Sequence, residues 1–215
     1  MRAFREAIAV GADGIECDVG LTKDLEPVIF HDTQLKRLCG IAGRLEDTSW
    51  KDLQKLKVFG QEPVPHLEEL LEMSGSFSIN LELKLTAKID SLVQGVGQRL
   101  SQVKSLDRIL ISSFSAAILL QAKEQVSPRP KLALIFESFS ELKFQKMKAC
   151  AWIKQWNVRG SCLMQSGGPQ DRPYWVWTLN EAADWKKVLE SNYPITAILS
   201  DHPDRLGQFL KTYSS

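Results

Sequence analysis

The sequence is short of the features that mark several common classes of protein. Its 215 residues include only 4 cysteines, Cys17, Cys39, Cys150 and Cys162. They form no Cys-x-x-Cys pair and lie near no cluster of histidines, which argues against a zinc site. The spacing fits a reducing compartment, although two disulfides are an alternative. We therefore interpret the cysteines as packing residues and expect a cytoplasmic location.

Long apolar runs and an excess of charge of one sign are also absent. Apolar stretches such as Ala116–Leu120 are far shorter than the roughly 20 residues of a membrane-spanning helix. Lysine and arginine number 27 against 26 acidic residues, so a net charge of +1 gives no broad field for nucleic acid or an anionic membrane. We expect a small-molecule partner, no nucleic acid and no membrane span; the oligomeric state is open.

What the sequence does contain is an alternation of strand-like and helix-like segments. Strand-like apolar runs occur at Gly14–Val19, Val28–Phe30, Ile79–Lys84, Ile109–Phe114, Leu132–Phe136, Ser161–Met164, Tyr174–Leu179 and Ile195–Ser200. Segments with helical periodicity lie at Leu67–Met73, Ile89–Leu100, Ala116–Val126, Phe139–Trp152 and Glu181–Leu189. This alternation predicts a parallel sheet covered by helices, in a single α/β domain that spans residues 1–215.

Glycine-rich phosphate-binding loops follow none of these strands. Neither a Gly-x-Gly-x-x-Gly nor a Walker motif is present, which weakens the case for an open, doubly wound nucleotide-binding sheet. A (β/α)8 barrel of the TIM type is therefore the preferred fold. The stretch from Gln165 to Pro173 is too short for a helical crossover between parallel strands, so we expect an irregular barrel with one shortened crossover.

Acidic residues stand on two of the predicted strands. Glu16 and Asp18 are two residues apart and face the same side of their strand, and so do Glu82 and Lys84. Alone, the acidic pair is also typical of a loop cap or of a surface contact with an arginine, and Glu82 with Lys84 is also typical of an intrastrand ion pair. In a barrel, polar groups at the C-terminal ends of strands meet at one mouth. Three converging carboxylates suit a hard ion, Ca²⁺ or Mg²⁺, and Lys84 beside them suits a phosphate oxygen.

One histidine ends the second strand-like run. The turn formers Asp24 and Pro27 predict that this strand folds back beside the first, which would bring His31 near the acidic pair. A histidine next to a metal-bound phosphoester is suited to general acid or base catalysis. His66 and His202 stand at predicted helix starts, where a structural role is expected.

Several motifs occur together and in order: "GIECDVGLTKDLEPVIFHDTQLKRLCG", "VPHLEELL", "LELK", "ILISSF", "VWTLN" and "ILSDHPDRL". They resemble the motifs of the glycerophosphodiester phosphodiesterase family over nearly the whole chain, most densely over residues 3–84. The resemblance implies a β/α barrel that uses a divalent cation to hydrolyse glycerophosphodiesters to sn-glycerol 3-phosphate and an alcohol. The site residues it implies are Glu16, Asp18 and Glu82 for the metal, His31 for catalysis, and Lys84 and Trp177 for the substrate.

Three departures from the family pattern are visible. The usual strand ending in His-Arg-Gly is missing before residue 1, so we expect an incomplete barrel with unpaired sheet edges at Gly14–Val19 and Ile195–Ser200. The crossover at Gln165–Pro173 is short. Leu25 replaces a hairpin glycine, and a left-handed turn there would cost roughly 1 kcal/mol. The missing strand and the short crossover leave open a catalytically impaired, metal-binding remnant of the same barrel, and the resemblance itself leaves open a lysophospholipase D-type activity.

Overall fold

The computed structural model describes residues 1–73, 75, 77–138, 152–166 and 168–213, and its centre is an eight-stranded sheet. The strands are β1 (Gly14–Leu21), β2 (Pro27–Ile29), β5 (Ser78–Leu83), β6 (Ile109–Ser113), β7 (Lys131–Phe136), β8 (Gln155–Arg159), β9 (Tyr174–Trp177) and β10 (Ile195–Ile198). Their spatial order is β10-β9-β8-β7-β6-β5-β1-β2. Only β2, which pairs with β1, runs antiparallel to its neighbour.

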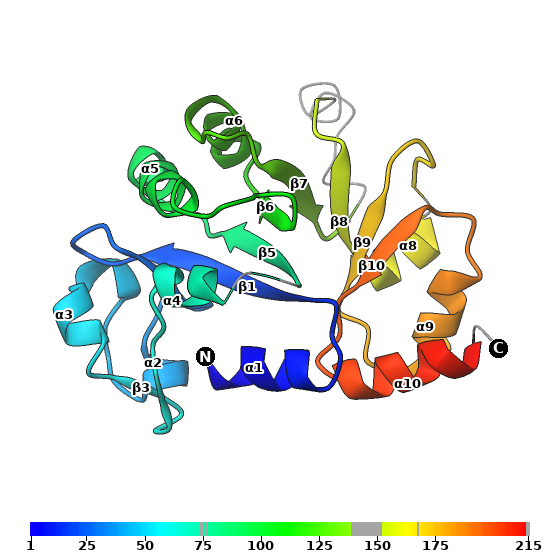
Figure 1. The fold of residues 1–215 in the computed structure, drawn as a ribbon, viewed down its shortest axis with the longest axis horizontal. Coiled ribbons are helices and arrows are strands. Elements are labelled where there is room, and N and C mark those ends of the chain that lie inside the picture. The colour runs from blue at the N-terminus through cyan, green and yellow to red at the C-terminus, as the bar shows by residue number, and fades with distance from the viewer. Residues whose placement is uncertain (74, 76, 139–151, 167, 214–215) are drawn as a thin grey trace.

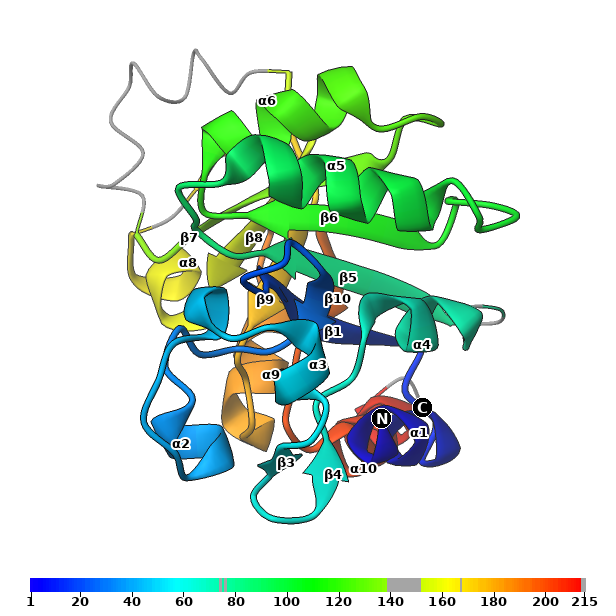
Figure 2. The same cartoon turned by 90° about the vertical axis from the view of Figure 1, so that its left-hand side faces the viewer.

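The sheet curls, and helices cover its outer side (Figure 1). These helices are α1 (Arg2–Ala9), α4 (Leu67–Glu72), α5 (Ile89–Leu100), α6 (Ala116–Gln125), α8 (Gly160–Ser166), α9 (Ala182–Leu189) and α10 (Pro203–Tyr213). Figure 2 shows α5 and α6 side by side over the middle strands. Within the described residues, β10 is an edge strand and Gly14–Cys17 of β1 pair with β5 alone.

Two hydrophobic cores hold the molecule together. The larger lies between the sheet and its helices and includes Val19, Leu81 and Ile111, all of which are fully buried. The smaller consists of Val28, Phe30, Leu35, Leu45, Leu53 and Val64. All of these residues belong to the segment 22–66, which we call the β1–β5 insert. Besides β2, the insert contains α2 (Lys36–Cys39), the short helix η1 (Leu45–Asp47), α3 (Trp50–Leu53), β3 (Lys57–Val58) and β4 (Glu62–Pro63).

The expectation of an α/β sheet of parallel strands is confirmed, with one strand misplaced. Residues Ser161–Met164, predicted as a strand, belong to helix α8, and the strand is Gln155–Arg159. In this strand the buried Trp156 and Val158 alternate with polar residues, and the polar residues hid the apolar pattern in the sequence. The crossover to β9 therefore contains a helix, and the expected lack of one was wrong. The predicted helix Phe139–Trp152 lies, except for Trp152, outside the described residues.

The cysteines agree with their interpretation as packing residues where the structure describes them. Cys17, Cys39 and Cys162 are free thiols, and Cys17 and Cys162 are buried in the main core. Cys150 lies outside the described residues. Among the helices of the described residues, none has both the length and the apolar character that a membrane crossing requires.

Candidate active site

A tight hairpin returns the chain from β1 to β2. Val19 pairs with Ile29, and the Phe30 backbone N–H donates to the Asp18 carbonyl at 2.9 Å. Leu25 adopts the left-handed conformation, with φ of 68°, as its place in the turn predicted. This conformation costs about 1 kcal/mol for a residue with a Cβ. The hairpin thus places His31 two residues after the end of β2, the strand that is paired with the acidic strand β1.

His31 is held by a charged chain of side chains. Its Nδ1 lies 2.7 Å from Asp32 Oδ1, and Arg37 donates to both Asp32 oxygens at 2.7 and 2.6 Å. The hydrogen bond from Arg37, together with that from His31, lowers the pKa of Asp32 to about 2. An ionised carboxylate can only accept, so Nδ1 carries the proton and Nε2 remains available for a substrate. Arg37 was missed from sequence; its signal is the spacing His-Asp-x₄-Arg.

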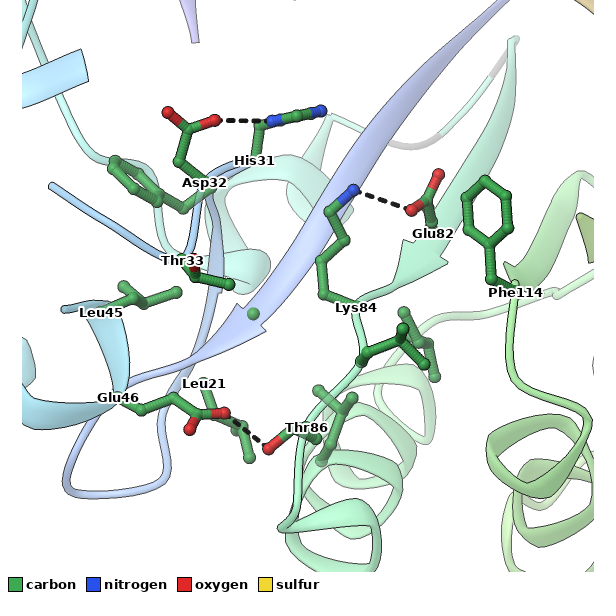
Figure 3. Close-up of a pocket in the computed structure, with 15 residues that line it drawn as sticks. Leu21, His31, Asp32, Thr33, Leu45, Glu46, Glu82, Lys84, Thr86 and Phe114 are labelled. Carbon is green, nitrogen blue, oxygen red and sulfur yellow. Dashed lines mark hydrogen bonds and ion pairs between the residues drawn. The ribbon is translucent and has the colours of Figure 1, made fainter. Parts of the chain in front are cut away.

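Lys84 lies between two of the predicted metal ligands. Its Nζ is 2.8 Å from Asp18 Oδ1 and 2.8 Å from Glu82 Oε1. Burial opposes the charge of Lys84, but the charge of Asp18 and hydrogen bonds to both carboxylates raise its pKa. Lys84 also lines a cavity of about 240 Å³ together with His31 and Glu82, and Figure 3 shows these side chains around it. The ammonium group is thus aimed at the same space as the imidazole.

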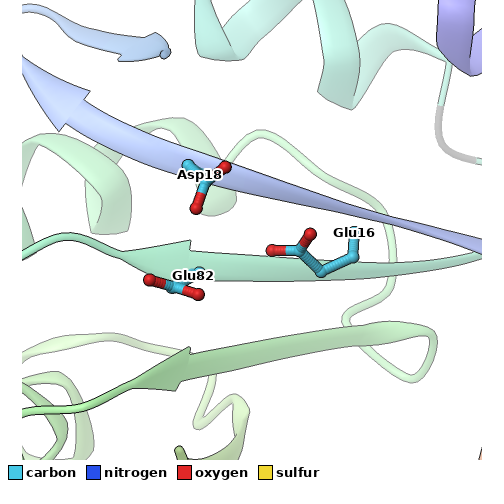
Figure 4. A group of neighbouring side chains, drawn as sticks. All are labelled: Glu16, Asp18 and Glu82. Carbon is cyan, nitrogen blue, oxygen red and sulfur yellow. The ribbon is translucent and has the colours of Figure 1, made fainter. Parts of the chain in front are cut away.

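Glu16, Asp18 and Glu82 converge on one side of the sheet (Figure 4). The register pairs Asp18 with Glu82, and each of the three residues offers an oxygen within 4.8 Å of the others. Burial, then the charges of Asp18 and Glu82, raise the pKa of Glu16 to about 8. Its buried Oε1 has no hydrogen-bond partner among the described residues. An orphaned oxygen among clustered carboxylates fits a hard divalent cation, with Glu16, Asp18 and Glu82 as ligands.

Trp177 stands apart from the acidic group but is linked to it by one ring. It packs edge-to-face on Phe114 at a centroid distance of 6.1 Å, and Phe114 lines the cavity at His31 and Lys84. Trp177 itself lines a separate cavity of about 430 Å³, and Arg159 lies over its ring at 5.4 Å. The structure therefore brings five of the six predicted residues around one mouth and places Trp177 at its side.

The other histidines have the structural positions expected of them. His66 is the N-cap of α4, where its Nδ1 accepts from the Glu68 N–H at 3.3 Å. Its Nε2 lies 3.2 Å from Glu26, which also binds Arg99. His202 precedes Pro203, the first residue of α10. Neither histidine lines a cavity with the carboxylates in the described part of the chain.

A curled α/β sheet with ionisable groups gathered at the C-terminal ends of its strands is the architecture of a barrel enzyme. Residues 1–205 match the sequence profile of the glycerophosphoryl diester phosphodiesterase family. The chain therefore belongs to this family and is a phosphodiester hydrolase.

Known relatives and solved structures agree with this assignment. A glycerophosphodiester phosphodiesterase of Caldanaerobacter subterraneus is 25% identical over 95% of this chain and 88% of its own. Human lysophospholipase D GDPD1 is 23% identical over 100% of this chain and 82% of its own. The Oleispira antarctica phosphodiesterase, solved with its product sn-glycerol-3-phosphate, superimposes with a TM-score of 0.84 at 22% identity, over 97% of this chain and 89% of that one.

Proposed function

We propose that the chain hydrolyses glycerophosphodiesters to sn-glycerol 3-phosphate and an alcohol with the help of Ca²⁺ or Mg²⁺. The observation that carries this proposal is the gathering of three carboxylates, an ammonium group and an imidazole at one mouth of the sheet. The carboxylates alone form an anionic site that repels phosphate. A divalent cation held by Glu16, Asp18 and Glu82 would, together with Lys84, offset that charge and polarise the phosphorus towards attack.

The chain's own residues then divide the remaining tasks. Lys84 binds a phosphate oxygen and stabilises the negative charge that develops there. Water oxygen forms a bond to phosphorus and loses a proton to solvent, the bond from phosphorus to the alcohol oxygen breaks, and His31 Nε2 passes a proton taken up from solvent to that oxygen. Asp32 and Arg37 keep the imidazole oriented and its Nδ1 protonated during the transfer. Trp177 and Phe114 provide an apolar wall for the glycerol carbons.

Release of sn-glycerol 3-phosphate from glycerophosphocholine, measured with an enzyme-coupled assay, tests the proposal. Ca²⁺ or Mg²⁺ should support turnover and EDTA should abolish it. Glu82→Gln should be as inactive as the wild type in EDTA. His31→Ala should react about 10²–10⁴-fold more slowly than the wild type. Glu124→Gln, an exposed carboxylate on α6, is the matched control. Equal rates with and without EDTA would refute the metal's part in the reaction.

Two other candidates are separated by the same assay. A lysophospholipase D activity is suggested by the human relative, and lysophosphatidylcholine is its test substrate. The cavity of about 240 Å³ favours a compact substituent, because pockets for drug-sized ligands span about 300–1,000 Å³. A metal-binding barrel without useful activity is the other candidate.

The impaired form is suggested by two features of the described residues. They bring a single histidine to the mouth and leave β10 unpaired with β1, where we propose that the family's His-Arg-Gly strand lies in complete barrels. Metal-induced stabilisation without release of sn-glycerol 3-phosphate would establish this alternative.

The free thiols of Cys17, Cys39 and Cys162 support the further proposal that the protein works in the cytoplasm.

A further inference from the structure

The cavity beside His31 and Lys84 has a charged far end. Figure 3 shows His31 and Lys84 at one end and the hydrogen-bonded pair of Glu46 and Thr86 at the other. Thr86 Oγ1 donates to Glu46 Oε1 at 2.6 Å and itself accepts from the Lys88 N–H at 3.0 Å. The carboxylate is therefore fixed between η1 and the loop that follows β5.

The walls between these two ends are apolar. Leu21, Leu45, Leu83 and Leu92 line the cavity and are each less than 5% exposed. Phe114 lines it as well and is 40% exposed, so its ring is accessible from the mouth. An apolar surround lowers the local dielectric and strengthens the field of a charge at its end.

The charge of Glu46 is not compensated within the described residues. No lysine, arginine or histidine nitrogen in that part of the chain forms an ion pair with it within 4.0 Å. Arg44, on the same short segment, pairs with Asp47 at 3.9 Å, and Lys84 is engaged by Asp18 and Glu82. The cavity thus has the ammonium group of Lys84 among carboxylates at one end, apolar walls, and a carboxylate without an ion-pair partner in the described residues at the other.

We propose that this cavity is the subsite for the leaving alcohol, and that Glu46 selects a substituent that carries an ammonium group. A phosphodiester of choline or ethanolamine has a negative phosphate and a positive nitrogen separated by two carbons. These charges match Lys84 at one end of the cavity and Glu46 at the other, and the carbons and methyl groups match the leucine walls. The inference rests on the proposed function, since it places the phosphate at Lys84.

Steady-state kinetics with glycerophosphocholine and glycerophosphoglycerol test the assignment, because the second substrate has a neutral alcohol of similar size. Glu46→Gln keeps the shape and the acceptor for Thr86 but removes the charge. It should lower kcat/KM for glycerophosphocholine about tenfold, mainly through KM, and leave glycerophosphoglycerol within about twofold. Asp47→Asn makes the same charge change one residue away, on a side chain that is 74% exposed, and should alter neither.

Calorimetric binding of the two diesters to His31→Ala, with Mg²⁺ or Ca²⁺ present, makes the result independent of turnover. Tighter binding of glycerophosphocholine that Glu46→Gln abolishes would support the subsite even if the wild-type chain hydrolysed neither diester, in which case only the proposed function would fall. Equal binding of both diesters, or no measurable binding of either, would overturn the subsite. Equal losses for both substrates in Glu46→Gln would also overturn it, since that pattern indicates a structural role.

Discussion

Glu16 makes the stability of the metal-free protein depend on pH in an unusual direction. Its pKa is raised from 4.5 to about 8, chiefly by burial and by the charges of Asp18 and Glu82. Between these two pH values the folded chain binds a proton that the unfolded chain has lost. The free energy of unfolding therefore falls as the pH rises through this window, by up to about 1.4 kcal/mol per pH unit, and levels off above pH 8. Over the whole window the fall is about 5 kcal/mol.

Glu16→Gln removes the titrating group and keeps its shape. In EDTA, urea unfolding from pH 5 to pH 9 should show a steep fall for the wild type and a much flatter curve for the variant. The variant should be the more stable of the two at pH 9 by several kcal/mol. Addition of Ca²⁺ or Mg²⁺ should reverse the order, because the cation stabilises the ionised site only in the wild type. Glu124→Gln on α6 is the control for charge.

A wild-type stability that does not fall between pH 5 and pH 8 would refute the reasoning. The same slope in Glu16→Gln and the wild type would assign the pH dependence to other groups. Either result would mean that Glu16 is less buried in solution than in the structure, because water reaches it or because β1 moves.

Two further substitutions test neighbouring charges. Lys84→Met should lower the melting temperature of the metal-free protein and tighten Ca²⁺ or Mg²⁺ binding about tenfold by calorimetry, because Lys84 competes for Asp18 and Glu82 from 2.8 Å. Unchanged affinity would show that the ammonium group does not compete. Arg37→Met should lower the free energy of unfolding at pH 6, and by less in high salt, because hydrogen bonds from the exposed Arg37 hold the pKa of Asp32 at about 2. This stabilisation is complete above pH 4 and is lost as the pH falls towards 2, so a loss of the same size at pH 3 and pH 6 in urea unfolding would contradict the assignment.

The acidic site was predictable because it depends on the shortest-range geometry of a strand. Residues two apart share a face, so Glu16 with Asp18 and Glu82 with Lys84 needed no knowledge of the fold. Their convergence required only that both strands be parallel neighbours, which the register of Asp18 with Glu82 confirms. His31 was predictable because the hairpin that returns it is encoded by its turn residues.

The remaining features depend on packing that the sequence does not display. Strand β8 was missed because Gln155, Asn157 and Arg159 interrupt its apolar pattern, although Asn157 is buried. Glu46 reaches its cavity only because Leu45, the residue before it, is buried in the smaller core. Arg37 meets Asp32 through the course of the chain into α2, which no periodicity specifies. Local alternation thus predicted the convergence of the three carboxylates, whereas tertiary packing determines where Arg37 and Glu46 lie.

The two hydrophobic cores support different parts of the candidate active site. The carboxylates stand on β1 and β5, whose side chains belong to the larger core, whereas His31 and Glu46 stand on the β1–β5 insert above the smaller one. Replacing the insert as a unit would leave the three carboxylates and Lys84 in place but would exchange His31 and Glu46, which we propose as the proton donor and as part of the alcohol subsite. Exchange of this one 45-residue segment, residues 22–66, would therefore alter the imidazole and the proposed alcohol subsite together, whereas the three carboxylates would stay on the sheet.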